Sequence, residues 1–114
     1  MSIRIYGLKN CDTCRKARKW LSDRNIDHEF VDVRDNTPSL AALKQWQTAL
    51  GEKLLNRRGT TWRQLSDADK ARADSNLPAL LHEYPALMKR PVMINGNGIH
   101  VGFDEKTWQD LLKK

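Results

Sequence analysis

The chain has 114 residues, a length that fits one domain around a single hydrophobic core. It is 39% hydrophobic and 30% charged, and it has no apolar run of the length found in a signal peptide or a transmembrane helix, so we expect a cytoplasmic protein that does not enter a membrane. The net charge of +6 favours anionic partners. Two cysteines are too few for a fold that depends on disulfide bonds for its stability.

The first predicted elements form a β-α-β unit. Residues 3–6 are a short β-prone run, and residues 12–24 place their apolar side chains on one side at helical spacing. Residues 28–33 alternate well enough to be a second strand. Because a crossover between strands of this kind is right-handed and returns the chain in the same direction, we expect the two strands to be parallel.

The middle of the chain, from about residue 38 to residue 88, has no convincing strand pattern and is predicted to be an all-helical insertion of several short pieces. Thr37, which precedes Pro38, is the preferred cap of its first helix. Residues 66–69 offer a cap for a later one.

Strand character returns near the end of the chain. Residues 91–94 and residues 99–101 are predicted to pair as a hairpin, because asparagine and glycine alternate over residues 95–98 and tolerate the positive φ of a tight turn. A final amphipathic helix follows, with Asp104 or Thr107 as its cap.

The order of elements is therefore β-α-β, several helices, then β-β-α. This order predicts an α/β protein of thioredoxin-like (glutaredoxin-type) fold, with a four-stranded mixed sheet and an all-helical insertion between the second and third strands. We expect residues 1–114 to form one domain. A ferredoxin-like fold has a similar order of strands and helices, but it does not predict cysteines at the first junction between a strand and a helix.

Cys11 lies at that junction, where the first predicted helix begins. The thiolate is the reactive form of cysteine, and a free cysteine has a pKa of about 8.5. Unpaired backbone N–H groups at a helix start stabilise an anion, and Lys9 and Arg15 add positive charge nearby. The sequence therefore predicts a lowered pKa for Cys11 and a role as nucleophile.

Cys14 follows one helical turn later, on the sheltered side of the same predicted helix. It has two interpretations that the sequence leaves open: a resolving cysteine, which attacks a mixed disulfide on Cys11, or a small buried residue that never reacts. A metal site is not predicted, because zinc needs about four ligands and the three histidines stand alone in separate elements.

Four segments of the sequence resemble the arsenate reductase/Spx family, and they cover nearly the whole chain in the right order. They are residues 11–21, 56–62, 83–92 and 100–105. Within the family, the sequence is most similar to the small YffB-like members. The resemblance implies a thioredoxin-like fold with a helical insertion, in agreement with the order of elements.

The resemblance also implies a site. The first cysteine, here Cys11, is the nucleophile of the family, and the matching arginines around it are Arg58 and Arg90, with Arg57 as the fallback for Arg58. It further implies a cis peptide bond before Pro91, facing the nucleophile. The residues predicted to bind the substrate or an anion are Lys9, Asn10, Arg15, Arg58, Arg90 and Pro91.

Two positions depart from the arsenate reductases of this family. Those enzymes carry a histidine four residues before the nucleophile, where this chain has Gly7, and a third arginine just after the fourth strand, where this chain has Gly102 and Phe103. A tetrahedral oxyanion needs several convergent donors. Arsenate reduction is therefore the second alternative rather than the leading hypothesis.

The leading hypothesis is a glutathione-dependent thiol reductase that binds no cofactor and uses glutathione as a co-substrate. The first alternative is an Spx-like regulator that binds RNA polymerase and senses oxidation through a disulfide between Cys11 and Cys14. Direct binding of nucleic acid is not expected, because the basic residues lack an interleaved aromatic platform. The tryptophans mostly fall on apolar stripes and are predicted to be core residues: Trp20, Trp46, Trp62 and Trp108.

Overall fold

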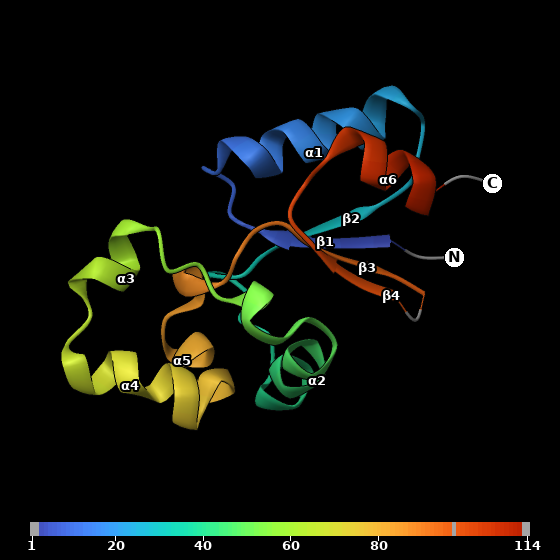
Figure 1. Ribbon diagram of the computed structural model, residues 1–114. Helices are drawn as coiled ribbons and strands as arrows, with labels where there is room; N and C mark the ends of the chain where they lie inside the picture. Colours follow the sequence, from blue (N-terminus) through green and yellow to red (C-terminus); the bar gives the residue numbers. More distant parts are fainter. Residues whose placement is uncertain (1–2, 97, 113–114) are drawn as a thin grey trace. The chain divides into compact units, whose positions relative to one another are not determined.

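The computed structural model describes residues 3–96 and 98–112 (Figure 1). Asn97, which belongs to the predicted hairpin turn, lies outside the described residues. The chain divides into two compact units, one made of the residues up to Asp32 and those from Arg90 onward, the other of Val33–Lys89. The single domain expected from the sequence stays a prediction. Among the described residues, no helix is long and apolar enough to cross a membrane.

The first unit is built on a four-stranded mixed sheet with the order β2-β1-β3-β4. Its strands are β1 (Ile3–Gly7), β2 (Glu29–Asp32), β3 (Val92–Asn95) and β4 (Gly98–Val101). The central strand β1 runs parallel to β2 and antiparallel to β3, so that Tyr6 pairs with Val31 on one side and with Val92 on the other. The predicted parallel β-α-β unit and the C-terminal hairpin are both confirmed, and with them the thioredoxin-like fold.

Two helices of the first unit pack on this sheet, and Figure 1 draws both on the same face of it. Helix α1 (Asp12–Asp23) buries its apolar side, as the spacing predicts. Helix α6 (Glu105–Leu111) begins after Asp104, whose carboxylate accepts the backbone N–H of Thr107 at 3.0 Å. Of the two predicted caps of this helix, Asp104 is therefore the one used.

Three aromatic rings join the two helices. Trp20 of α1 and Trp108 of α6 meet edge to face with their centroids 6.2 Å apart, and Phe103 packs against Trp108 at 4.8 Å. The indole N–H of Trp108 donates to the carbonyl of Gly102 at 3.1 Å. Beneath the rings lie Ile5 and other buried residues of the sheet, so the core of this unit lies between the sheet and the two helices.

The second unit is helical throughout, which confirms the predicted insertion. Its elements are α2 (Leu40–Leu50), the 3₁₀ helix η1 (Gly51–Leu54), α3 (Thr60–Gln64), α4 (Asp67–Ser75), α5 (Leu77–Glu83) and the 3₁₀ helix η2 (Pro85–Leu87). An antiparallel bridge pairs Leu55, the residue after η1, with Met88, the residue after η2. Two hydrogen bonds flank that bridge: Asn56 N–H donates to Leu87 at 2.8 Å, and Lys89 N–H donates to Leu54 at 2.7 Å.

The predicted cap at Thr37 is wrong. Helix α2 is capped by Ser39, whose hydroxyl accepts the backbone N–H of Ala42 at 3.1 Å. The hydroxyl of Thr37 instead donates to the carbonyl of Val33 at 2.9 Å, which closes the turn before the helix. The later cap is confirmed, because Ser66 accepts the N–H of Asp69 at 3.1 Å.

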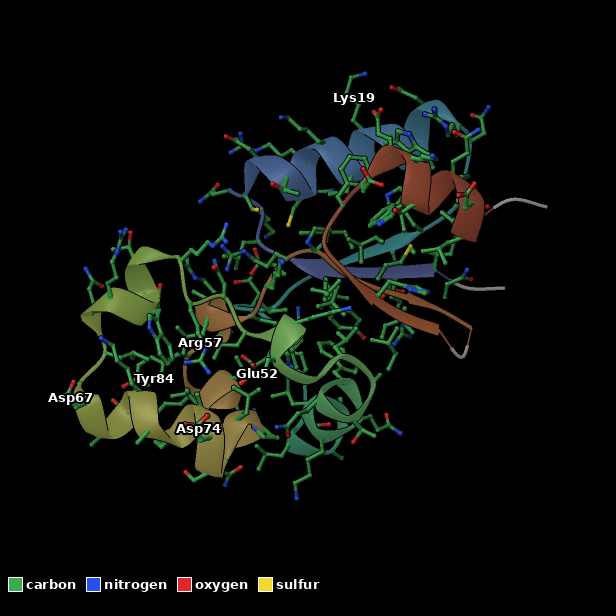
Figure 2. The ribbon with its side chains drawn as sticks, in the orientation of Figure 1. Lys19, Glu52, Arg57, Asp67, Asp74 and Tyr84 are labelled. Atoms are coloured by element: carbon green, nitrogen blue, oxygen red, sulfur yellow. The ribbon has the colours of Figure 1, made fainter. Side chains whose placement is uncertain are left out.

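The tryptophans follow the prediction with one exception. Trp20, Trp46 and Trp108 are buried. Trp62 is half-buried on the short helix α3, where the guanidinium of Arg57 lies 4.9 Å from its ring centroid. Arg57 also pairs with Glu52 at 3.6 Å, and Figure 2 labels both side chains.

Candidate active site

Cys11 stands between the central strand and the first helix of the first unit. Its backbone N–H donates to the carbonyl of Leu8 at 3.2 Å, and its own carbonyl accepts the N–H of Arg15 at 3.0 Å. It is the N-cap residue of α1, with an extended backbone (φ −91°, ψ 121°). The chain therefore turns from strand to helix at the predicted residue, and the thiol faces the free N–H groups of the first helical turn.

The surroundings of Cys11 favour its thiolate. Partial burial raises the pKa of this half-buried thiol, but the backbone N–H of Cys14, the Cys14 thiol and the Arg90 guanidinium together lower the pKa below its usual range. The Cys11 side chain makes no geometric capping hydrogen bond with the helix. Stabilisation therefore falls on the charged form, because an anion attracts N–H groups and a guanidinium more strongly than a neutral thiol does.

The segment with Arg90 and Pro91 reaches Cys11 as the family resemblance implies. The Arg90–Pro91 peptide bond is cis. Arg90 is half-buried and close enough to Cys11 to hydrogen-bond its sulfur. The carbonyl of Pro91 accepts the backbone N–H of Gly102 at 2.8 Å, which ties this segment to the end of β4. Whether Arg90 and Pro91 bind a substrate stays a prediction.

The contribution of Lys9 and Arg15 to the lowered pKa of Cys11 stays a prediction. The groups identified as lowering the pKa of Cys11 are on Cys14 and Arg90. The Arg15 guanidinium is held by other partners, because it donates to the carbonyl of Lys9 at 3.3 Å and to the Asp12 carboxylate at 3.1 Å. Exposed charges of this kind are also screened by water and salt.

Lys9 and Asn10 lie on the exposed turn before Cys11. The backbone N–H of Lys9 donates to the Asp32 carboxylate at 3.0 Å, which links this turn to the end of β2. Both side chains are therefore presented on an anchored turn next to the thiol. Their predicted role in binding an anion stays a prediction.

Arg58 belongs to the second unit and is described within it. Its side chain is exposed, and its backbone N–H donates to the side-chain oxygen of Asn56 at 3.0 Å. This short turn follows the bridge between Leu55 and Met88, so the base of the turn is fixed. The role of Arg58 at the thiol, implied by resemblance, stays a prediction.

Cys14 is fully buried, and it contacts Cys11 all the same. Burial raises the pKa of Cys14 to about 12, and the nearby Cys11 sulfur adds to the shift, although the Leu8 N–H and Arg90 oppose it. Cys14 is thus protonated at neutral pH and donates its S–H to the sulfur of Cys11. Cys14 is therefore a buried residue that also touches Cys11, and whether it resolves a mixed disulfide stays a prediction.

The two glycines that replace family side chains have different surroundings. Gly7 is buried and lies against the Cys14 sulfur, a contact that sequence spacing did not reveal. Gly102 has open space around it but a left-handed backbone with φ +84°, which strains any other residue. The described residues include no group of three or more histidine, cysteine or acidic side chains that suits a metal ion.

The model of the ArsC family matches residues 6–111. The chain belongs to the ArsC family. A Haemophilus influenzae protein without an assigned function is 42% identical over 109 residues, which span 94% of this chain and 96% of that one. A solved structure named as a YffB protein superimposes with a TM-score of 0.91 at 34% identity, over 96% of this chain and 98% of that one.

A global transcriptional regulator, Spx 2 of Bacillus cereus, is also similar. It is 24% identical over 113 residues, which span 96% of this chain and 86% of the regulator. The regulators that the resemblance suggested therefore have a counterpart among the similar proteins. Together with the thioredoxin-like fold and the activated thiol of Cys11, membership of the ArsC family supports a thiol-based redox function.

Arg90→Met is expected to raise the pKa of Cys11, because it removes the guanidinium that stabilises the thiolate. Alkylation of Cys11 by iodoacetamide then needs a higher pH, and its rate at pH 7 falls roughly threefold, the effect of about 1 kcal/mol at a half-exposed group, partly offset by a more nucleophilic thiolate. Arg15→Met is the matched control and should leave the midpoint of the pH profile unchanged. An equal shift in both variants would contradict this assignment.

Proposed function

We propose that the protein is a glutathione-dependent thiol–disulfide reductase with Cys11 as its nucleophile. The observation that carries the proposal is the asymmetry of the two sulfurs. Cys11 is half-exposed and its pKa is lowered, whereas Cys14 is fully buried and its pKa is raised to about 12. Only Cys11 combines access to solvent with a lowered pKa, which favours its thiolate.

The reaction has two exchange steps. In the first, the Cys11 thiolate attacks the glutathione sulfur of a mixed disulfide. A bond forms between Cys11 and glutathione, the substrate disulfide breaks, and the substrate leaves as a thiolate that takes a proton from solvent. In the second, the thiolate of another glutathione attacks the adduct on its glutathione sulfur. This step releases oxidised glutathione and restores the Cys11 thiolate, so glutathione is oxidised and the substrate reduced.

The buried state of Cys14 supports an external thiol for the second step. A resolving cysteine must attack as a thiolate, and burial, the largest cause of the raised pKa of Cys14, disfavours that form even when Cys11 carries an adduct. Its fully buried sulfur also limits access to a bulky adduct. Glutathione is present in excess in reducing cells and meets neither obstacle, so Cys14 is not required for turnover.

The recognition of glutathione is proposed to rest on its two carboxylates. Lys9, Arg58 and Arg90 are the cations that the sequence assigns to an anionic substrate. Arginine suits this role because its planar fork matches a carboxylate. Arg90 contacts Cys11, which favours a carboxylate close to the reacting sulfur. Asn10, Arg15 and Pro91 are further candidates for contacts to the substrate.

Incubation with oxidised glutathione, followed by mass spectrometry of the intact protein and its peptides, tests the proposal. We expect one glutathione adduct on Cys11 and turnover of a glutathione mixed disulfide when reduced glutathione is supplied. Cys14→Ser should retain both, because it keeps the nucleophile. Absence of an adduct and of turnover in the wild-type protein would contradict a glutathione-dependent reductase.

The second candidate is a redox-sensing regulator that binds RNA polymerase. The contact between the two sulfurs favours it, because a two-electron oxidant such as hydrogen peroxide can join Cys11 and Cys14 without a large movement. The similarity to the Spx 2 regulator adds to it. A Cys11–Cys14 disulfide without an adduct, together with capture of purified polymerase in one redox state, would favour this candidate. No capture in either state would remove it.

A further inference from the structure

We propose that Gly7 is a positioning residue of the site, because only a glycine at this place lets the Cys14 sulfur reach Cys11. Gly7 is the last residue of β1 and is buried behind the first turn of α1. The inference rests on the proposed role of Cys11 as nucleophile. It concerns the acidity of that nucleophile rather than the identity of the substrate.

The geometry of the contact identifies the Cys14 sulfur as the single obstacle to a side chain at position 7. A Cβ atom added to Gly7 would overlap the Sγ of Cys14. The other close atoms are at ordinary contact distance, with the Cys14 Cβ and the Phe30 Cε1 both at 3.5 Å. A methyl group therefore fits at position 7 as soon as the sulfur is absent.

The backbone supplies no other reason for a glycine at position 7. The described glycines with a left-handed φ are Gly51, Gly96 and Gly102, and Gly7 is not among them. Gly7 instead pairs with Asp32 in the parallel ladder of β1 and β2. Glycine inside a strand costs stability, and it often marks a site where another group approaches closely. Here that group is the thiol of Cys14.

The sulfur of Cys14 cannot yield to a methyl group without leaving Cys11. It is fully buried and interacts with both the Leu8 N–H and the Cys11 sulfur. A cysteine side chain has only three staggered positions, so the sulfur moves by a whole rotamer step rather than by a small shift. Gly7→Ala therefore separates the two sulfurs while both cysteines stay in the chain.

Four proteins test this: the wild type, G7A, C14A and the double variant G7A/C14A. The readout is the pH dependence of Cys11 alkylation by iodoacetamide. We expect G7A and C14A each to move the midpoint to higher pH and to slow alkylation at pH 7 roughly threefold, as expected for the loss of one hydrogen bond to a charged sulfur. The double variant should behave like C14A alone, because the methyl group then has no sulfur to displace.

A midpoint in G7A equal to that of the wild type would overturn the inference, and so would additive shifts in the double variant. Unfolding in urea supplies a second readout: G7A should be less stable than the wild type, whereas G7A/C14A should be at least as stable as C14A. If G7A does not fold, the double variant must still fold for the inference to stand. Alkylation needs no glutathione, so a failure here is distinct from a failure of glutathione turnover.

Discussion

Cys11→Ser is expected to abolish alkylation, glutathione adduct formation and turnover, while the protein stays folded. A serine hydroxyl is not ionised near neutral pH and does not attack disulfides. Serine is, however, a preferred N-cap residue, and Cys11 holds the N-cap position of α1. We therefore expect the free energy of unfolding to stay within about 1 kcal/mol of the wild type or to rise. Intact mass after treatment with oxidised glutathione and unfolding in urea measure the two effects.

Cys14→Ser serves as the control for this prediction. It removes the buried thiol but keeps a hydroxyl of similar size, so the adduct on Cys11 should still form. An adduct that persists in Cys11→Ser and disappears in Cys14→Ser would transfer the nucleophilic role to Cys14. A loss of folding in Cys11→Ser would contradict the half-exposed N-cap position described for Cys11.

Trp108→Ala is expected to produce the largest loss of stability, about 3–5 kcal/mol, as is typical when a buried tryptophan is truncated in a core. Trp108 is 1% exposed, and its ring packs against both Trp20 and Phe103. Its indole N–H also satisfies the carbonyl of Gly102. The substitution thus leaves a cavity, removes one ring contact from each of Trp20 and Phe103, and leaves the Gly102 carbonyl without its indole donor. Urea unfolding followed by circular dichroism measures the change, since the fluorescence of Trp108 is lost.

Trp62→Ala is the matched comparison for a tryptophan outside the core. Trp62 is half-buried, and its ring faces the cations of Arg57 and Lys70, contacts that contribute about 1 kcal/mol at an exposed site. We expect a loss near that size. Equal losses in the two variants would contradict the assignment of Trp108 to the core. Trp108→Phe, which keeps a ring but loses the N–H donor, should fall between the two alanine variants.

The order of the elements could be predicted from the sequence because it depends on local patterns. Helical spacing over residues 12–24 and alternation over residues 28–33 are each recognisable within a short stretch of sequence. The right-handed crossover between the two strands then makes them parallel. The cap of α2 was assigned wrongly because Thr37 and Ser39 both suit a cap. The choice depends on whether the Thr37 hydroxyl reaches Val33, which is a tertiary contact.

The position of Cys11 at a helix start could also be predicted, but not the groups that act on its pKa. Sequence neighbours of Cys11 such as Arg15 were expected to lower its pKa. The guanidinium identified as lowering it belongs to Arg90, far along the chain. Only the family resemblance indicated Arg90 and the cis bond before Pro91. The link between Gly7 and Cys14 was missed because it joins the end of a strand to the inner side of a helix.

The hydrogen bonds at Gly102 give the site a natural spectroscopic reporter. The Trp108 indole N–H donates to the Gly102 carbonyl at 3.1 Å, and the Gly102 N–H donates to Pro91 at 2.8 Å, next to Arg90. An indole N–H has its own well-separated signal in proton–nitrogen NMR spectra. A ligand that binds Arg90 or the carbonyl of Pro91 is expected to change these two hydrogen bonds and thereby to shift the indole N–H signal of Trp108. The buried Trp108 signal can therefore record binding at the surface without any label attached near Cys11.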